Sequence, residues 1–193
     1  MRLFFLCFLL LLKIEVKAQT DVLKDSRDGH EYKTVQIGTQ TWMAENLLYT
    51  AIPCSYCFDS LSPVCINKPC NDMYGAYYTW DAAQKACPAE WHLPGKEEFE
   101  KLLVTIGGTK KDKFNALIKG GSSGFNVLLG SGWGRVINKD SAGVVFFKCA
   151  GFWTSTENDE KTTYRFFFST LKTLNFVAEN KQKIAFSVRC IKD

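Results

Sequence analysis

The sequence predicts an α+β domain in which two to three short helices pack on mainly antiparallel strands. Three observations lead to this fold class. Segments rich in β-branched and aromatic residues lie near both ends of the chain. Segments with helical periodicity lie between them. The length of 193 residues, with 46% hydrophobic and 23% charged side chains, suits one globular domain and argues against general disorder.

The first eighteen residues are typical of a secretory signal peptide. A basic tip precedes the apolar run from Leu3 to Leu12, and Val16-Lys17-Ala18 fits a cleavage site. This run is far shorter than the roughly 20 apolar residues that span a bilayer, and no later segment is long and apolar enough. We therefore expect residues 1–18 to be removed. We expect the mature chain, without membrane insertion, to be secreted to the extracellular space, the cell surface or the periplasm.

The charge balance gives no reason to expect nucleic acid as a partner. The formal net charge is +4, and the predicted signal peptide contains three basic residues and one acidic residue. The mature chain keeps 21 basic and 19 acidic residues, too even a balance for a surface that binds phosphate backbones. The two histidines of the chain, His30 and His92, limit histidine-based catalysis and metal binding.

The first elements of the mature chain are predicted as strands. A short segment, residues 19–27, precedes a domain that we place at residues 28–193. Residues 32–42 have β character, with turns expected at Asp28-Gly29 and Gly38-Thr39. Residues 51–72 are rich in Cys, Pro and Asn, and we expect them to form an irregular loop.

The middle of the chain predicts short helices. Thr79 can cap a first helix that ends at Cys87-Pro88, because proline cannot continue it. A second helix is predicted from Gly95 to Ile106, because apolar residues recur at the i, i+3, i+4 and i+7 positions of one face. Residues 111–119 form a weaker third candidate.

The last third of the chain predicts strands. Glycines punctuate residues 120–134, which we expect to form a loop region that continues to Asp140. Strands are predicted at residues 144–147, 164–168, 174–177 and 184–191. In the last of them Phe186, Val188 and Cys190 alternate with Ser187 and Arg189, which predicts one apolar and one polar face.

Seven cysteines follow the signal peptide, and export favours disulfides over free thiols. Cys54, Cys57, Cys65 and Cys70 lie close together, a spacing that zinc sites also use. We favour disulfides here because an exported chain meets an oxidising environment. A nested arrangement, Cys54–Cys70 around Cys57–Cys65, is our preferred pairing, and the sequence leaves all three connectivities open.

Several strings of the chain together resemble one family of exported bacterial proteins. The strings occur in this order: Asp28-Gly29-His30-Glu31-Tyr32, Val35-Gln36-Ile37-Gly38, Thr41-Trp42-Met43-Ala44-Glu45-Asn46-Leu47, Tyr74-Gly75-Ala76-Tyr77-Tyr78-Thr79-Trp80, Cys87-Pro88-Ala89-Glu90-Trp91-His92-Leu93-Pro94, Gly151-Phe152-Trp153-Thr154-Ser155-Thr156-Glu157 and Phe186-Ser187-Val188-Arg189-Cys190. They resemble the Fibrobacter succinogenes major paralogous domain, and the resemblance covers Asp28 to Asp193.

This family is similar in plan to C-type-lectin-like domains, which implies a disulfide. In such domains a cysteine at the end of a helix pairs with a cysteine of the last strand. Carried over, the resemblance implies a Cys87–Cys190 bridge. The bridge would close a loop of about 100 residues and contribute about 4–5 kcal/mol in the chain-entropy model. On this scheme Cys149 is left over, and we expect it to be a small buried side chain.

The resemblance does not by itself imply a lectin activity. The Glu-Pro-Asn and Gln-Pro-Asp motifs that hold sugar-binding calcium in true lectins do not occur, so calcium has no supporting motif and we expect no cofactor. We interpret the acidic run Glu157-Asn158-Asp159-Glu160 as a solvated turn and His92 as structural. No catalytic constellation stands out, and we expect the chain not to be an enzyme.

The glycine-rich region from Gly120 to Asp140 is the expected contact surface. Equivalent loops carry ligand contacts in lectin-like domains, and Trp133, Arg135 and Asn138 are the candidate residues. We expect a secreted, non-catalytic binding module that recognises a glycan or an extracellular protein. Two alternatives remain: an enzyme on a formylglycine-generating-like scaffold, and a structural subunit of the cell envelope or of a surface fibre.

Overall fold

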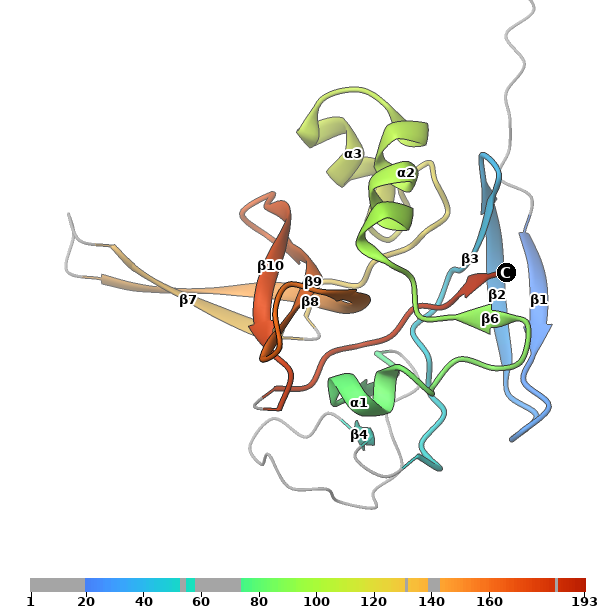
Figure 1. Cartoon of the computed structure of the whole chain (residues 1–193). Coiled ribbons are helices and arrows are strands. Elements are labelled where there is room, and N and C mark those ends of the chain that lie inside the picture. Colours follow the sequence, from blue (N-terminus) through green and yellow to red (C-terminus); the bar gives the residue numbers. More distant parts are fainter. Residues whose placement is uncertain (1–19, 53–54, 58–73, 131, 139–142, 183) are drawn as a thin grey trace, which may run out of the picture.

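The computed structural model describes residues 20–52, 55–57, 74–130, 132–138, 143–182 and 184–193. For residues 20, 55–57, 132–138 and 143–147 it describes the backbone. The predicted signal peptide, residues 1–18, lies outside the described residues. Within them, the chain folds as a mixed structure of mainly antiparallel strands and three short helices (Figure 1). No helix in these ranges is long and apolar enough to cross a membrane.

One sheet joins the two ends of the domain. Its strand order is β1-β2-β3-β11-β6, and every neighbouring pair is antiparallel. The strands are β1 Thr20–Lys24, β2 Glu31–Ile37, β3 Gln40–Met43, β6 Trp91–His92 and β11 Ile191–Lys192. The predicted turns are present, since Gly29 and Gly38 have φ values of 77° and 61°, which glycine adopts without strain. Ile191 of β11 inserts between Trp42 of β3 and His92 of β6.

The second sheet is a four-stranded meander in the order β10-β9-β8-β7. Its strands are β7 Gly132–Asn138, β8 Gly143–Glu157, β9 Thr162–Ser169 and β10 Leu174–Asn180, and a small β4–β5 pair joins Ser55–Cys57 to Ala76–Tyr78. The predicted strands 164–168 and 174–177 lie within β9 and β10. The expected loop at residues 132–138 is instead a strand, because its backbone pairs with residues 143–149 of β8.

The three helices occupy the predicted segments, with some changes of length. The helix α1, Trp80–Ala83, is shorter than predicted, and its Thr79 cap accepts a hydrogen bond from the Ala82 backbone N–H. The helix α2, Lys96–Ile106, begins where Glu98 Oε2 accepts a hydrogen bond from Gly95 N at 2.7 Å. The helix α3 spans Lys110–Leu117 and starts with a Thr109–Asp112 capping box.

The core consists of two apolar clusters. The first lies under α2 and α3 and is built around Trp42, Phe99, Phe125, Phe152 and Phe166. The second lies under α1 and is built around Tyr32, Tyr78, Trp153, Val188 and Cys190. Each cluster draws residues from both ends of the described chain, so neither forms before distant segments meet.

The tail segment Phe186–Cys190 runs between these clusters, and the prediction of a strand over residues 184–191 was wrong. It forms isolated bridges at Phe186 and Ser187, and β11 begins only at Ile191. All five residues are at most 9% exposed, so the predicted polar face is buried as well. Arg189 tolerates this burial because its guanidinium donates to Asn46 Oδ1 and to the carbonyl oxygens of Phe125 and Asn126.

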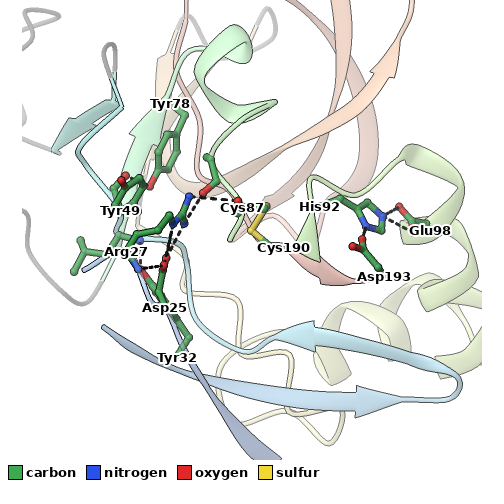
Figure 2. The surroundings of a disulfide bond; sticks show 12 residues. Asp25, Arg27, Tyr32, Tyr49, Tyr78, Cys87, His92, Glu98, Cys190 and Asp193 are labelled. Atoms are coloured by element: carbon green, nitrogen blue, oxygen red, sulfur yellow. Dashed lines mark hydrogen bonds and ion pairs between the residues drawn. A yellow bond between two sulfur atoms is a disulfide. The ribbon is translucent and has the colours of Figure 1, made fainter. Parts of the chain in front are cut away.

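A disulfide closes the domain. It joins Cys87, just after α1, to Cys190 in the tail, the pairing that the lectin-like resemblance implies. The two Cα atoms are 5.8 Å apart across 103 residues of sequence. Figure 2 shows how Arg27 supports this junction: it donates to the carbonyl oxygens of Ala86 at 2.8 Å and Cys87 at 3.3 Å.

Candidate functional site

The predicted contact residues Trp133, Arg135 and Asn138 lie on β7, in the hairpin that β7 makes with β8. Their register partners are Lys148, Phe146 and Gly143. Figure 1 shows this hairpin extending away from the rest of the domain. Trp133 and Arg135 are two positions apart, whereas Asn138 has the opposite parity, so the three do not belong to one face of the ribbon.

The cysteine-rich loop is mostly beyond the described part of the chain. Cys54, Cys65 and Cys70 lie outside the described residues, and so do the pairings predicted for them. Cys57 is the last residue of β4, where its backbone pairs with Ala76. The proposed connectivities therefore stay predictions.

Cys149 occupies the position expected of it. It lies in β8 opposite Gly132 and Ser169, and its side chain is 7% exposed. Burial raises the pKa of the Cys149 thiol, which disfavours the thiolate that nucleophilic chemistry requires.

His92 is held between two carboxylates, as Figure 2 shows. Its Nδ1 lies 2.5 Å from Asp193 Oδ1, and its Nε2 lies 2.9 Å from Glu98 Oε1. Burial lowers the pKa of His92, but the hydrogen bonds to Asp193 and Glu98 outweigh it and raise the pKa overall. Both ring nitrogens are engaged, so His92 fastens the tail and β6 to α2 and is not positioned as a general base.

The acidic run at residues 157–160 forms a self-contained turn between β8 and β9. Asp159 Oδ1 accepts hydrogen bonds from the backbone N–H groups of Lys161 and Thr162, both at 2.8 Å. Asp159 Oδ2 accepts from the Thr162 hydroxyl at 2.7 Å, and this hydrogen bond leads the interactions that lower the pKa of Asp159. Both carboxylate oxygens of Asp159 therefore accept hydrogen bonds within the turn. Among the described residues, no three His, Cys, Asp or Glu side chains gather so as to hold a metal ion.

A groove of about 420 Å³ opens beside this turn. Its walls come from three segments far apart in sequence: the start of α1, the β8–β9 turn and the residues that follow β10. They contribute Trp80 and Asp81, then Glu160 and Lys161, then residues 180–182. We call this feature the α1 groove. Its volume falls in the range of about 300–1,000 Å³ typical of small-molecule sites.

One wall of the α1 groove is a fixed pair, Trp80 and Lys181. Trp80 Nε1 donates to the Thr154 carbonyl oxygen at 3.0 Å, which sets the indole against β8. Lys181 Nζ lies 4.6 Å from the indole centroid and 2.7 Å from Glu157 Oε2. The Lys181 side chain is only 11% exposed, so its charge is neutralised and shielded.

The other side chains of the α1 groove are uncommitted. Asp81, Glu160, Lys161 and Gln182 make no side-chain hydrogen bond or ion pair with another described residue. Asp81, Glu160, Lys161 and Gln182 are all exposed. The groove is thus lined by a half-buried indole and by polar side chains that make no hydrogen bond or ion pair with other described residues.

Sequence reasoning did not find the α1 groove. Trp80 lies in one of the strings that carry the family resemblance, and no spacing pattern connects residue 81 with residues 160 and 182. The only available signal was a tryptophan at a helix start followed by an acidic residue, which is common in ordinary helices.

Comparison with known sequences now identifies the family. The sequence model of the Fibrobacter succinogenes major domain matches residues 35–192. The chain belongs to the Fibrobacter succinogenes major domain family. No curated protein and no solved structure matches it.

The matched region of this Fibrobacter succinogenes major domain contains the first core cluster, the disulfide and the α1 groove, and every buried member of the second cluster except Tyr32. It begins at Val35, in the middle of β2, so β1 precedes the match. Asp25 and Arg27 also precede it, yet Arg27 donates to backbone oxygens next to Cys87 and its guanidinium lies 3.9 Å from the Tyr49 ring centroid. The segment before the match is therefore packed onto the domain as part of one structure.

Proposed function

We propose that this chain is an exported, non-catalytic binding module of C-type-lectin-like plan. It acts at the cell surface or outside the cell, and it recognises a glycan or a protein partner. The observation that carries the proposal is the long β7–β8 hairpin, which extends from a disulfide-closed body (Figure 1).

The base of the hairpin supports a binding role. Residues 149–154 of β8 are buried in the body, and residues 149–153 pair with β9. A hairpin anchored in this way can offer its strands to a partner without the entropic cost of ordering a whole loop. Trp133 and Arg135 lie on it, and tryptophan and arginine are enriched among the residues that dominate binding interfaces.

The C-type-lectin-like plan has support in the arrangement of elements. A short helix with paired alanines, Ala82 and Ala83, precedes a cysteine that is bridged to the tail. The second helix follows, and then an antiparallel sheet. The bridge also supports export, because disulfides persist in oxidising compartments.

The chemistry of the cysteines argues against the enzyme alternative. A formylglycine-generating-like enzyme needs a reactive cysteine pair near its C-terminus. Cys190 is consumed by the disulfide, and burial raises the pKa of the Cys149 thiol. Neither residue offers a ready thiolate.

The test is a binding screen of the full chain purified after export, on arrays of glycans and extracellular proteins, with and without calcium. We expect Trp133→Ala to weaken binding by tenfold or more while leaving the circular dichroism spectrum and the thermal midpoint unchanged. Leu171→Ala is the matched control, because it removes another apolar side chain, 56% exposed, from a different turn. A binder that is insensitive to Trp133→Ala would remove the hairpin from the proposal, and no binder on either array would refute it.

A further inference from the structure

We propose that the α1 groove binds a short uncharged oligosaccharide. This inference rests on the proposed function and names the ligand class for a site other than the hairpin. The shape of the groove, its balance of charge and the surface that Trp80 contributes all favour such a ligand.

The shape fits a short ligand segment. The groove is lined by the start of α1, the β8–β9 turn and the residues that follow β10. Figure 1 shows α1 near the lower ends of β9 and β10. Its roughly 420 Å³ suits a small molecule and is too small for a folded partner. The walls come from elements held by backbone pairing, such as Lys181 N to Lys161 O at 3.1 Å, so the site exists before any ligand arrives.

The charge of the lining excludes polyanions as the favoured ligand. Two acidic side chains, Asp81 and Glu160, face two lysines, Lys161 and Lys181. Glu157 already pairs with the ammonium of Lys181. The charge that remains is not positive, so a sulfated or uronate chain gains no net attraction. An uncharged polyol instead pairs with both the acceptors and the donors that line the groove.

The surface itself is amphipathic, as is a sugar ring. The Trp80 side chain is half-buried and lines the groove, and its Nε1 already donates to the Thr154 carbonyl oxygen, so Trp80 contributes an apolar ring with no free donor. Around it stand a carboxylate, Asp81, and an amide, Gln182, neither of which is bonded to another described residue. A pyranose presents C–H groups on its faces and hydroxyls at its rim, so the same ligand satisfies the indole and the polar rim together.

The test uses defined hexasaccharides as probes. Uncharged cello-, xylo-, manno- and chitohexaose are titrated into ¹⁵N-labelled protein, with hexagalacturonate and a heparin hexasaccharide as anionic probes. The chain has five tryptophans, so the indole resonance of Trp80 is assigned as the one that Trp80→Phe removes. We expect at least one uncharged probe to shift this resonance.

Two exposed groove residues then test the assignment by calorimetry. We expect Asp81→Ala and Gln182→Ala each to raise Kd about threefold to tenfold, as the loss of a ligand hydrogen bond does. Glu97→Ala on α2 and Asn175→Ala on β10 are matched controls, because both residues are exposed and lie outside the groove. Thermal midpoints show that all four variants fold.

Each outcome is decisive. A shift of the Trp80 resonance together with weaker binding by both groove variants supports the inference. Binding of the anionic probes alone, or uncharged binding unaffected by Asp81→Ala and Gln182→Ala, overturns it. If a partner from the arrays binds through the hairpin but no uncharged hexasaccharide shifts the Trp80 resonance, the proposed function stands and the inference about the groove fails.

Discussion

Replacing the buried Arg189 by methionine should strongly destabilise the domain. Arg189 is 1% exposed, and burial lowers its pKa to about 9, so it still carries its charge at neutral pH. The guanidinium lies beside two aromatic rings, 4.5 Å from the Phe125 centroid and 5.2 Å from that of Phe152. It also donates to Asn46 Oδ1 at 2.9 Å, which ties the tail to the segment after β3.

Two opposing terms set the magnitude. Methionine leaves three acceptors without a donor: Asn46 Oδ1 and the Phe125 carbonyl oxygen, which are buried, and the Asn126 carbonyl oxygen, which is partly buried. Each orphaned acceptor costs about 1–3 kcal/mol. Methionine also removes the desolvation cost of the buried charge, which is several kcal/mol. For this reason, replacing a whole buried ionic group by apolar residues is often neutral for stability. In Arg189→Met the acceptors remain without their donor. The change should therefore resemble the removal of one partner from a buried pair, which destabilises a protein by about 3–5 kcal/mol.

The assay is urea unfolding of wild type and Arg189→Met, with Lys192→Met as the matched control. Lys192 is exposed in the same tail, so its replacement should change stability by less than about 0.5 kcal/mol. The Arg189→Met loss corresponds to a fall in the thermal midpoint of about 6–20 °C for a domain of this size. A loss below about 1 kcal/mol would show that other groups satisfy the three acceptors, and it would refute this reasoning.

Two further predictions concern the tail. Reducing the Cys87–Cys190 bridge should remove about 4–5 kcal/mol of stability, which calorimetry detects as a lower thermal midpoint. Peptide mapping that finds these cysteines unlinked would contradict the pairing. The pKa of His92 is raised in the folded state. Its contribution to the free energy of unfolding is therefore fully present below the unfolded-state pKa of about 6.5, and it is lost as the pH rises through the folded-state pKa. The gap in thermal midpoint between wild type and His92→Ala should therefore shrink from pH 5.5 to pH 9, and a gap that does not change with pH would contradict this role.

Local sequence signals were sufficient wherever an element is defined by its own residues. The second helix is the clearest example, because the spacing of its apolar residues predicted both its extent and the burial of Phe99 and Leu102. Turn chemistry at Gly29 and Gly38 and the cap at Thr79 were equally readable. The Cys87–Cys190 pairing came from family resemblance, since spacing alone does not select partners.

Local signals failed where distant segments supply the partners. Glycines at 132 and 134 predicted a loop, but pairing with β8 makes residues 132–138 a strand. The alternation in residues 186–190 predicted a polar face, but Ser187 and Arg189 are buried because they lie against Phe152 and its neighbours in the first core cluster. A hydrophobic pattern records which residues prefer burial, and it does not record which polar residues find buried partners.

The sequence by itself determined the family, the α+β class, the helices and their caps, because these depend on short-range propensity and on ordered motifs. Tertiary structure alone decided how residues far apart in sequence come together. It holds His92 between Glu98 and Asp193. It also brings the start of α1 next to residues 160–161, about eighty residues later in sequence, and next to residues 180–182, and so forms the α1 groove. The physical reason is that hydrogen bonding and burial act on distance in space, which only the folded chain sets.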